Sequence, residues 1–445
     1  MLLIHDAAHL VIDSTTEASD ADLAVSDVVL TPEQAASAQA AESGASTPVD
    51  RLDASGCVVT PGLVNAHHHL LQSAFRTLPG TRGVPMHVWL PTMAAEYAAI
   101  GINPELARAA ALVGVAEGLL SGVTTVADHH LTWPSGSDTV GIATATATAA
   151  RELGGRLAFV RGSARDDPEE AAASAEAIAQ ALVPDAPGGI SADGLLQLAV
   201  GPAGVHSDSE QTFRLLGEVA ARRGLRRRTQ ANEQVDVAIA LEKYGKRPIE
   251  LLEEWGWLAS DVTLAHLCAV TDDEIALLAA RGVTATHAPG CDLPMGWGIA
   301  PVAALRAAGI PVGLGTSGGG SNDAGHLLAD ARLAMQVAPL AGPPIDARSI
   351  LSMASEGSAL GLGRTELGHL RPGAAADLCV WDVTGAADAG VADPVAGLLW
   401  ANPGRRPKHV VVAGRVVVRD YELVAADQRA VASELDALLT ARRAS

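Results

Sequence analysis

Short apolar runs alternate with Ala- and Leu-rich amphipathic stretches along the middle of the chain. Four helical stretches are clear from their periodicity, at Pro104–Leu120, Glu169–Leu182, Glu210–Arg223 and Asp272–Arg281. Eight runs have the length and composition of buried strands: Leu63–His67, Val123–Asp128, Leu157–Arg161, Leu196–Gly201, Arg226–Gln230, Val262–His266, Thr284–His287 and Val312–Ser317. Because strands that alternate with helices form a parallel sheet, and eight such units close a ring, the pattern predicts a (β/α)8 barrel of the α/β class.

The two ends of the chain carry the remaining β-rich runs, at Leu2–Ile4, Leu10–Ile12, Leu23–Leu30, Asp377–Trp381 and His409–Arg419. We expect them to pair into one small β-sandwich domain made of residues 1–59 and 367–423. The barrel would then occupy residues 60–366, and a C-terminal helix would lie within residues 424–445. The segment Thr31–Pro48 has no strand periodicity, which predicts a surface loop or a short helix.

Composition limits the partners of the chain. Its 445 residues are 48% hydrophobic with positive mean hydropathy, enough for a barrel with one satellite domain. The 51 acidic residues exceed the 31 basic ones, and the net charge of -20 opposes binding to nucleic acid and to anionic membrane surfaces. No apolar run reaches the roughly 18 residues of a membrane span, and the N-terminus lacks the pattern of a signal peptide. We therefore expect a cytoplasmic protein with a small-molecule partner.

The four cysteines, Cys57, Cys268, Cys291 and Cys379, are scattered along the chain. None belongs to a Cys-x-x-Cys pair. This spacing argues against a disulfide framework and against a thiolate zinc site, and it favours a reducing compartment.

Histidines gather where the predicted strands end. Of the 14 histidines, seven lie at or just past such an end: His67, His68, His69, His129, His130, His266 and His287. Barrel enzymes build their active sites on this face. His67 and His69 alternate along the first strand, so their imidazoles point the same way and can share a zinc, iron or nickel ion. A histidine triplet at a strand end can also be polar filling, and the residues alone leave both interpretations open.

Longer runs carry a resemblance to a known family. Thr60–His69 resembles the opening signature of the amidohydrolase superfamily, in which a His-x-His pair ends the first strand. Leu367–Gly373 and Val410–Arg415 resemble the closing β-domain of that superfamily, so the resemblance spans nearly the whole chain. Three further runs resemble the branch of chlorotriazine and hydroxytriazine hydrolases and of guanine, 8-oxoguanine and pterin deaminases: Thr124–His130, Met295–Gly298 and Gly315–Asp323.

The resemblance implies a set of metal ligands from which this chain departs twice. His67, His69 and His266 match the expected histidines of strands 1 and 6. Strand 5 should end in a histidine and strand 8 in an aspartate, but these positions hold Gln230 and Ser317. Glutamine is a weaker zinc ligand than imidazole, although some chlorotriazine hydrolases resemble this chain in having a hydroxyl residue at the second position. The implied cofactor is one divalent metal, zinc or iron, on the three histidines with Gln230 or water, and its occupancy depends on these two replacements.

The implied activity is hydrolysis of a non-peptide carbon–nitrogen or a carbon–halide bond in a small nitrogen heterocycle, such as a triazine, pterin or purine. A metal-activated water adds to an electron-poor ring carbon, and Glu233, three residues after Gln230, transfers the proton to the ring or leaving group. We also count Ser317 among the catalytic candidates, and expect His287 to hydrogen-bond the developing charge.

The resemblance and the strand ends also suggest how the substrate is held. We expect Gln72 and Trp89, from a long loop after strand 1, Trp297 and His130 to line the substrate pocket. His129 and His130 are further candidates for orienting a ligand histidine. For each of these residues, ordinary packing or structural hydrogen bonding is the alternative.

The two replaced ligands leave another class of function open. A degenerate metal site could serve a lyase or cyclase, or a protein that binds a ligand without chemistry. The retention of His67, His69, His266 and Glu233 favours the hydrolase. Since relatives commonly pair, the resemblance also implies a homodimer.

Overall fold

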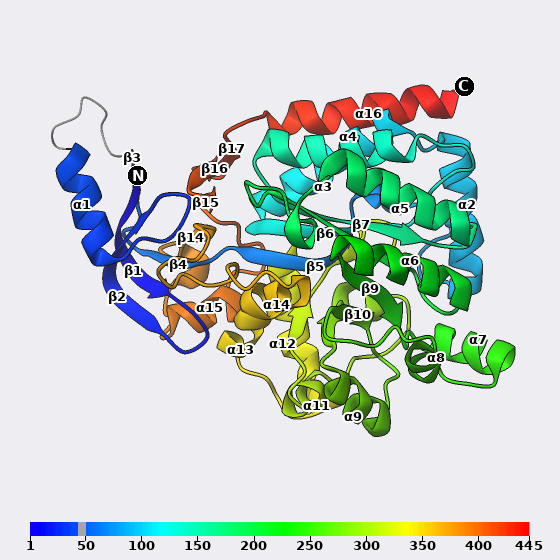
Figure 1. The fold of residues 1–445 in the computed structure, drawn as a ribbon. Coiled ribbons are helices and arrows are strands. Elements are labelled where there is room, and N and C mark those ends of the chain that lie inside the picture. The colour runs from blue at the N-terminus through cyan, green and yellow to red at the C-terminus, as the bar shows by residue number, and fades with distance from the viewer. Residues whose placement is uncertain (43–49, 445) are drawn as a thin grey trace.

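The computed structural model describes residues 1–42 and 50–444, which contain a parallel barrel and a mixed sheet (Figure 1). All neighbouring barrel strands pair in parallel, and helices cover the outside. The barrel strands are β5 (Leu63–His69), β6 (Val123–His130), β7 (Arg156–Ser163), β8 (Leu196–Pro202), β9 (Arg226–Ala231), β10 (Val262–His266), β11 (Thr284–His287), β12 (Val312–Leu314) and β13 (Ser317–Gly318). The predicted (β/α)8 fold is confirmed, since these strands include seven of the eight predicted runs in full and both ends of the eighth.

The eighth strand position is split, where the sequence predicted one continuous strand. β12 pairs with β11 and β13 pairs with β5, so the sheet returns to its first strand. Ser317 lies opposite His68 across this closing pair and has a left-handed φ of 54°. The chain leaves its pairing with β11 after Leu314 and begins its pairing with β5 at Ser317, which divides the strand into two short segments.

The helices around the barrel begin and end at recognisable residues. The side chain of Ser209 accepts a hydrogen bond from Thr212 N at the start of α6, and Gly224 ends this helix with a φ of 67°. The larger outer helices are α2 (Met86–Ile100), α3 (Pro104–Leu120), α4 (Thr139–Leu153), α5 (Pro168–Leu182), α6 (Glu210–Arg223), α7 (Val235–Tyr244), α9 (Asp272–Arg281), α12 (Leu327–Ala341) and α16 (Gln428–Ala444). Shorter helices are α8 (Pro248–Glu254), α10 (Pro289–Asp292), α11 (Val302–Ala307), α13 (Ala347–Ser352), α14 (Ser358–Leu362) and α15 (Pro394–Trp400). The main core includes Phe159, Phe213 and Trp257.

Strands from both ends of the chain form the mixed sheet, beside which the N-terminus lies in Figure 1. They are β1 (Leu2–Val11), β2 (Glu17–Val25), β3 (Asp50–Asp53), β4 (Cys57–Pro61), β14 (Leu378–Asp382), β15 (His409–Val412), β16 (Arg415–Arg419) and β17 (Glu422–Leu423). The expected separate runs at residues 2–4 and 10–12 form the single strand β1, because a register shift between Ile4 and Ala7 lets the pairing continue past its polar middle. The segment expected to be a loop or short helix contains α1 (Pro32–Glu42), and its residues 43–48 lie outside the described ranges. The proposed domain boundaries stay a prediction.

The segment after the first barrel strand is not the long loop that the sequence suggested. It forms the short 3-10 helix η1 (Leu70–Ala74), an irregular stretch over residues 75–85, and then α2, which contains Pro91. A proline removes one backbone hydrogen bond from a helix, and this hid α2 from the sequence pattern. Within residues 1–42 and 50–444, no single helix is long and apolar enough to cross a membrane; α2 and α3 reach that length only together, with a bend of 119°.

A buried ion pair joins the barrel to the mixed sheet. Arg156 on β7 donates two hydrogen bonds to Asp377, at 2.7 and 2.9 Å, and the two side chains are only 4% and 3% exposed. Asp377→Asn leaves the arginine charge buried without a counterion, and we expect it to lower the free energy of unfolding by about 3–5 kcal/mol. Denaturant unfolding measures this loss.

The matched control is Glu218→Gln, which breaks an exposed arginine–glutamate pair with Arg214. We expect the control to cost less than about 1 kcal/mol. Equal losses for Asp377→Asn and Glu218→Gln would contradict a structural role for the buried pair.

Candidate metal and active site

The barrel brings together the three predicted histidine ligands. His67 and His69 belong to β5, His266 ends β10, and all three side chains are buried. The ring centroid of His67 lies 4.9 Å from that of His69 and 5.2 Å from that of His266. Two imidazoles that bind one cation at about 2.1 Å, nearly at right angles, have centroids about 5 Å apart. The spacing of the rings around His67 therefore fits a shared cation.

The hydrogen bonds of the rings leave nitrogen atoms available on the inner side. His69 Nδ1 donates to the backbone carbonyl oxygen of His129 at 2.6 Å, and His266 Nδ1 donates to Asp292 Oδ1 at 2.6 Å. Such bonds fix the tautomer of a ligand histidine and direct its Nε2 at the metal. His67 Nε2 is buried with no hydrogen-bond partner among the described residues. A buried polar atom without a partner is costly, and a metal would satisfy it. The residues present therefore fit a metal.

Burial keeps two of these imidazoles neutral. Burial, assisted by the neighbouring His266, lowers the pKa of His69 to about 4 and that of His67 well below its ordinary value. Neutral imidazole is the form that binds metals. At His266, burial acts in the same direction but Asp292 outweighs it and raises the pKa.

Gln230 and Ser317 occupy the two positions where stronger ligands were expected. Gln230 Oε1 lies 3.2 Å from His266 Nε2. Two ligands of one cation, each at about 2.1 Å, are about 3.2 Å apart when they subtend roughly 100°, so this amide oxygen stands at ligand distance. Ser317 is buried at the closing strand, and its Oγ lies 3.4 Å from Ser321 Oγ.

Glu233 lies in the loop after β9 and is 1% exposed. Neither carboxylate oxygen has a hydrogen-bond partner among the described residues, and Oε1 is 3.7 Å from His266 Nε2. Asn232 and Gln234 on either side have left-handed φ values of 55° and 47°, a costly backbone that persists where the surroundings fix it. Burial raises the pKa of Glu233 to about 8, although His266 opposes the shift. A carboxyl group that holds its proton near neutral pH suits proton transfer.

A cavity of about 420 Å³ opens above these groups. His69, Gln230, Glu233 and Ser317 reach it from the barrel. Its walls are mostly apolar and aromatic, and they include Met86, Trp89, Leu90, Met93, Tyr97, Leu131, Trp133, Met295 and Trp297. Cavities of roughly 300–1,000 Å³ with such walls bind small organic molecules.

Three of the four residues predicted to line the pocket do so. The amide of Gln72 is already engaged, since Oε1 accepts from Gly320 N at 3.0 Å and Nε2 donates to Tyr97 OH at 3.1 Å. Trp89 comes from α2 and donates its Nε1 hydrogen to Gly320 O at 3.0 Å. The Trp297 ring meets the His266 ring edge to face at 5.1 Å. Gln72 and the tryptophans therefore shape the cavity, and Trp297 also packs against a candidate ligand.

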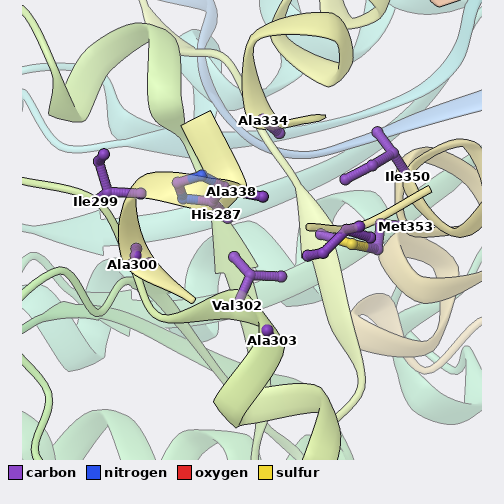
Figure 2. A pocket seen from close by; sticks show the side chains of 11 residues that line it. His287, Ile299, Ala300, Val302, Ala303, Ala334, Ala338, Ile350 and Met353 are labelled. Atoms are coloured by element: carbon purple, nitrogen blue, oxygen red, sulfur yellow. The ribbon is translucent and has the colours of Figure 1, made fainter. Parts of the chain in front are cut away.

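His130 and His287 are not among the described residues that line this cavity. His130 packs against Trp133, with ring centroids 4.4 Å apart, and its Nε2 donates to Thr132 O. His287 lies in a separate small cavity beside Ile299 and Val302 (Figure 2).

Among the described residues His287 faces Asp292 and not the cavity, and its expected hydrogen bond to the developing charge stays a prediction. β11 ends at His287 and the chain then turns into α10, whose last residue Asp292 contacts both His287 and His266. The turn therefore places the His287 ring beside Asp292, with His287 Nδ1 3.6 Å from Asp292 Oδ2.

Sequence reasoning missed the two groups that hold the ligand rings. The expected partners of a ligand histidine were the rings of His129 and His130, but His69 is held by the backbone oxygen of His129. Asp292 was overlooked, although a carboxylate five residues after a strand-ending histidine was a visible signal.

Comparison with known proteins adds to this geometry. The model of the amidohydrolase family matches residues 58–417. The 8-oxoguanine deaminase of Pseudomonas aeruginosa is 34% identical over 405 residues, which cover 86% of this chain and 89% of that enzyme. An isoxanthopterin deaminase from an unknown prokaryotic organism is 31% identical over 421 residues, 86% of this chain and 85% of that enzyme. The crystal structure of atrazine chlorohydrolase TrzN from Arthrobacter aurescens, complexed with zinc, superposes with a TM-score of 0.89 at 32% identity and covers 99% of this chain and 100% of the other.

Proposed function

Since the chain belongs to the amidohydrolase family, we propose that it is a metal-dependent hydrolase of a carbon–nitrogen or carbon–halide bond in a small nitrogen heterocycle. This class of substrate is supported by three relatives, whose names indicate a purine, a pterin and a triazine as their substrates. The observation that carries the proposal is the cluster of three imidazoles around the unpaired Nε2 of His67, with the unpaired carboxyl group of Glu233 beside it.

His67, His69 and His266 would hold the divalent metal, and the oxygen of Gln230 would complete the set. The zinc in the related crystal structure favours zinc. When bound, the metal supplies a water molecule that is activated at neutral pH. The protonated carboxyl group of Glu233 would deliver its proton to a ring nitrogen or to the leaving group, and the carboxylate left behind would take a proton from the water that adds to the ring carbon.

The aromatic and apolar walls of the cavity support a flat ring as the substrate. Trp89, Trp133 and Trp297 offer aromatic surfaces on which a heteroaromatic ring can stack. Because the amide of Gln72 is occupied by Gly320 and Tyr97, stacking and shape contribute more to recognition than this side chain does. A homodimer and a cytoplasmic location stay predictions.

A release assay tests the proposal. Zinc-loaded protein is incubated with chloro- and amino-substituted s-triazines, pterins and purines, and free chloride, amine and ammonia are measured. We expect release from at least one of these classes, abolished by a chelator and restored by added zinc. Zinc-loaded protein that releases nothing from any member of the panel would contradict the proposal.

One contact favours a second candidate, a protein that binds its ligand without a metal. Gln230 Oε1 can accept a hydrogen bond from His266 Nε2 at 3.2 Å, which satisfies both atoms without a cation. Zinc titration separates the two candidates, because only the hydrolase takes up zinc at this site.

A further inference from the structure

We infer that Asp292 is a positioning residue for the metal site, which holds His266 and supplies the negative charge that the direct ligands lack. The inference rests on the proposed function, since it concerns how the same metal is bound. Asp292 is not one of the described residues that line the cavity. It acts through the imidazole of His266, to which it is hydrogen-bonded.

The contact between Asp292 and His266 is short and fully enclosed. Asp292 Oδ1 accepts from His266 Nδ1 at 2.6 Å, and both side chains are 0% exposed. A carboxylate on Nδ1 fixes the proton there, leaves the Nε2 lone pair for a metal and makes the imidazole a stronger donor. His266 therefore needs Asp292 for both its tautomer and its direction.

The backbone fixes both partners. His266 has a left-handed φ of 75°, an unfavourable conformation that its surroundings must impose. Asp292 ends α10, where its N donates to Ala288 O at 3.0 Å and its O accepts from Trp297 N at 2.9 Å. Trp297 in turn packs against the His266 ring. The carboxylate and the imidazole are thus held in register independently of any bound metal.

His287 extends the arrangement behind Asp292. Its Nδ1 lies 3.6 Å from Asp292 Oδ2, the oxygen that His266 does not use. The carboxylate therefore lies between two buried imidazoles. This contact gives a role to a strand-ending histidine that does not reach the cavity.

The negative charge of Asp292 lies where it can offset the positive charge of the proposed metal. The resemblance implies an aspartate on the metal at the end of the eighth strand, where this chain has Ser317. Gln230 is also neutral, so neither of the two residues that stand in place of the expected ligands brings a negative charge. Asp292 supplies one at the far side of a ligand ring, where it still offsets the charge of a divalent cation.

The substitution Asp292→Asn tests the inference, because it keeps the size of the side chain and removes its charge. We expect zinc to bind about 10- to 100-fold more weakly, as measured by competition with a chromogenic chelator. The matched control is Asp330→Asn, a buried carboxyl group that bonds with Asn322. We expect the control to bind zinc as tightly as the wild type.

Cobalt(II) provides a second readout that a purely structural role would not change. The visible spectrum of the cobalt-substituted protein reports ligand geometry, and we expect it to differ from the wild type in Asp292→Asn but not in Asp330→Asn. Should Asp292→Asn not fold, His287→Leu removes only the rear contact. This variant is expected to weaken zinc binding less than tenfold but measurably.

The outcomes separate the inference from the proposed function. Wild-type protein that binds zinc while Asp292→Asn binds it equally tightly, with an unchanged cobalt spectrum, would overturn the inference and leave the hydrolase intact. Unchanged zinc affinity in His287→Leu, where that variant replaces Asp292→Asn, would also overturn it. Wild-type protein that takes up no zinc would overturn both.

Discussion

Replacing Glu233 by glutamine is expected to lower kcat by about 10²- to 10⁴-fold while the zinc content stays that of the wild type. The amide has the size of the carboxyl group but cannot carry the transferred proton. Glu233 is suited to this role because its side chain is buried and neither carboxylate oxygen has a hydrogen-bond partner among the described residues. It lies beside His266 but is not one of the three candidate ligands. Steady-state kinetics on the best substrate of the panel, together with metal analysis, measures both quantities.

The control for this variant is Glu210→Gln, at an exposed position in the first turn of α6. We expect it to keep wild-type kinetics. Undiminished turnover in Glu233→Gln would remove Glu233 from the mechanism, and loss of zinc together with activity would instead make it a metal-binding residue.

Removing the central imidazole should have the largest effect. In His67→Ala we expect zinc to fall from about one ion per chain to a small fraction, and activity to fall to background, because the His67 ring lies beside both other ligand rings. Elemental analysis after dialysis against zinc measures the loss.

The neighbouring His68 provides a matched control for this loss. It is equally buried, but its Nδ1 pairs with Thr316 Oγ1 at 2.9 Å on the other side of the strand. Folded His68→Gln should keep its zinc. Retention of zinc by His67→Ala, or equal loss in both variants, would contradict the proposed ligand set.

The regular parts of the fold could be predicted because their signals are local. The helix Glu210–Arg223 matched its predicted bounds, since Ser209 caps its start and Gly224 ends it. Features that depend on distant partners could not be predicted. The bulge that makes β1 continuous arises from pairing with β2, and the division of the eighth strand arises from pairing with two different neighbours.

The candidate site shows the same division. His67 and His69 were predicted because strand alternation sets the direction of their side chains at a strand end, and His266 because the resemblance implied a ligand histidine at the end of strand 6. The role of His287 depends on the turn into α10, which brings Asp292 against it, and no periodicity reveals that turn. The bond from His69 to the carbonyl oxygen of His129 was equally hidden, because every residue carries such an oxygen.

The most direct test of the central claim is anomalous X-ray diffraction at the zinc edge from crystals of the zinc-loaded protein. We expect one strong peak within about 2.0–2.2 Å of the inner nitrogen atoms of His67, His69 and His266. A fully loaded crystal with no peak between these three rings, or with its only peak elsewhere, would contradict it.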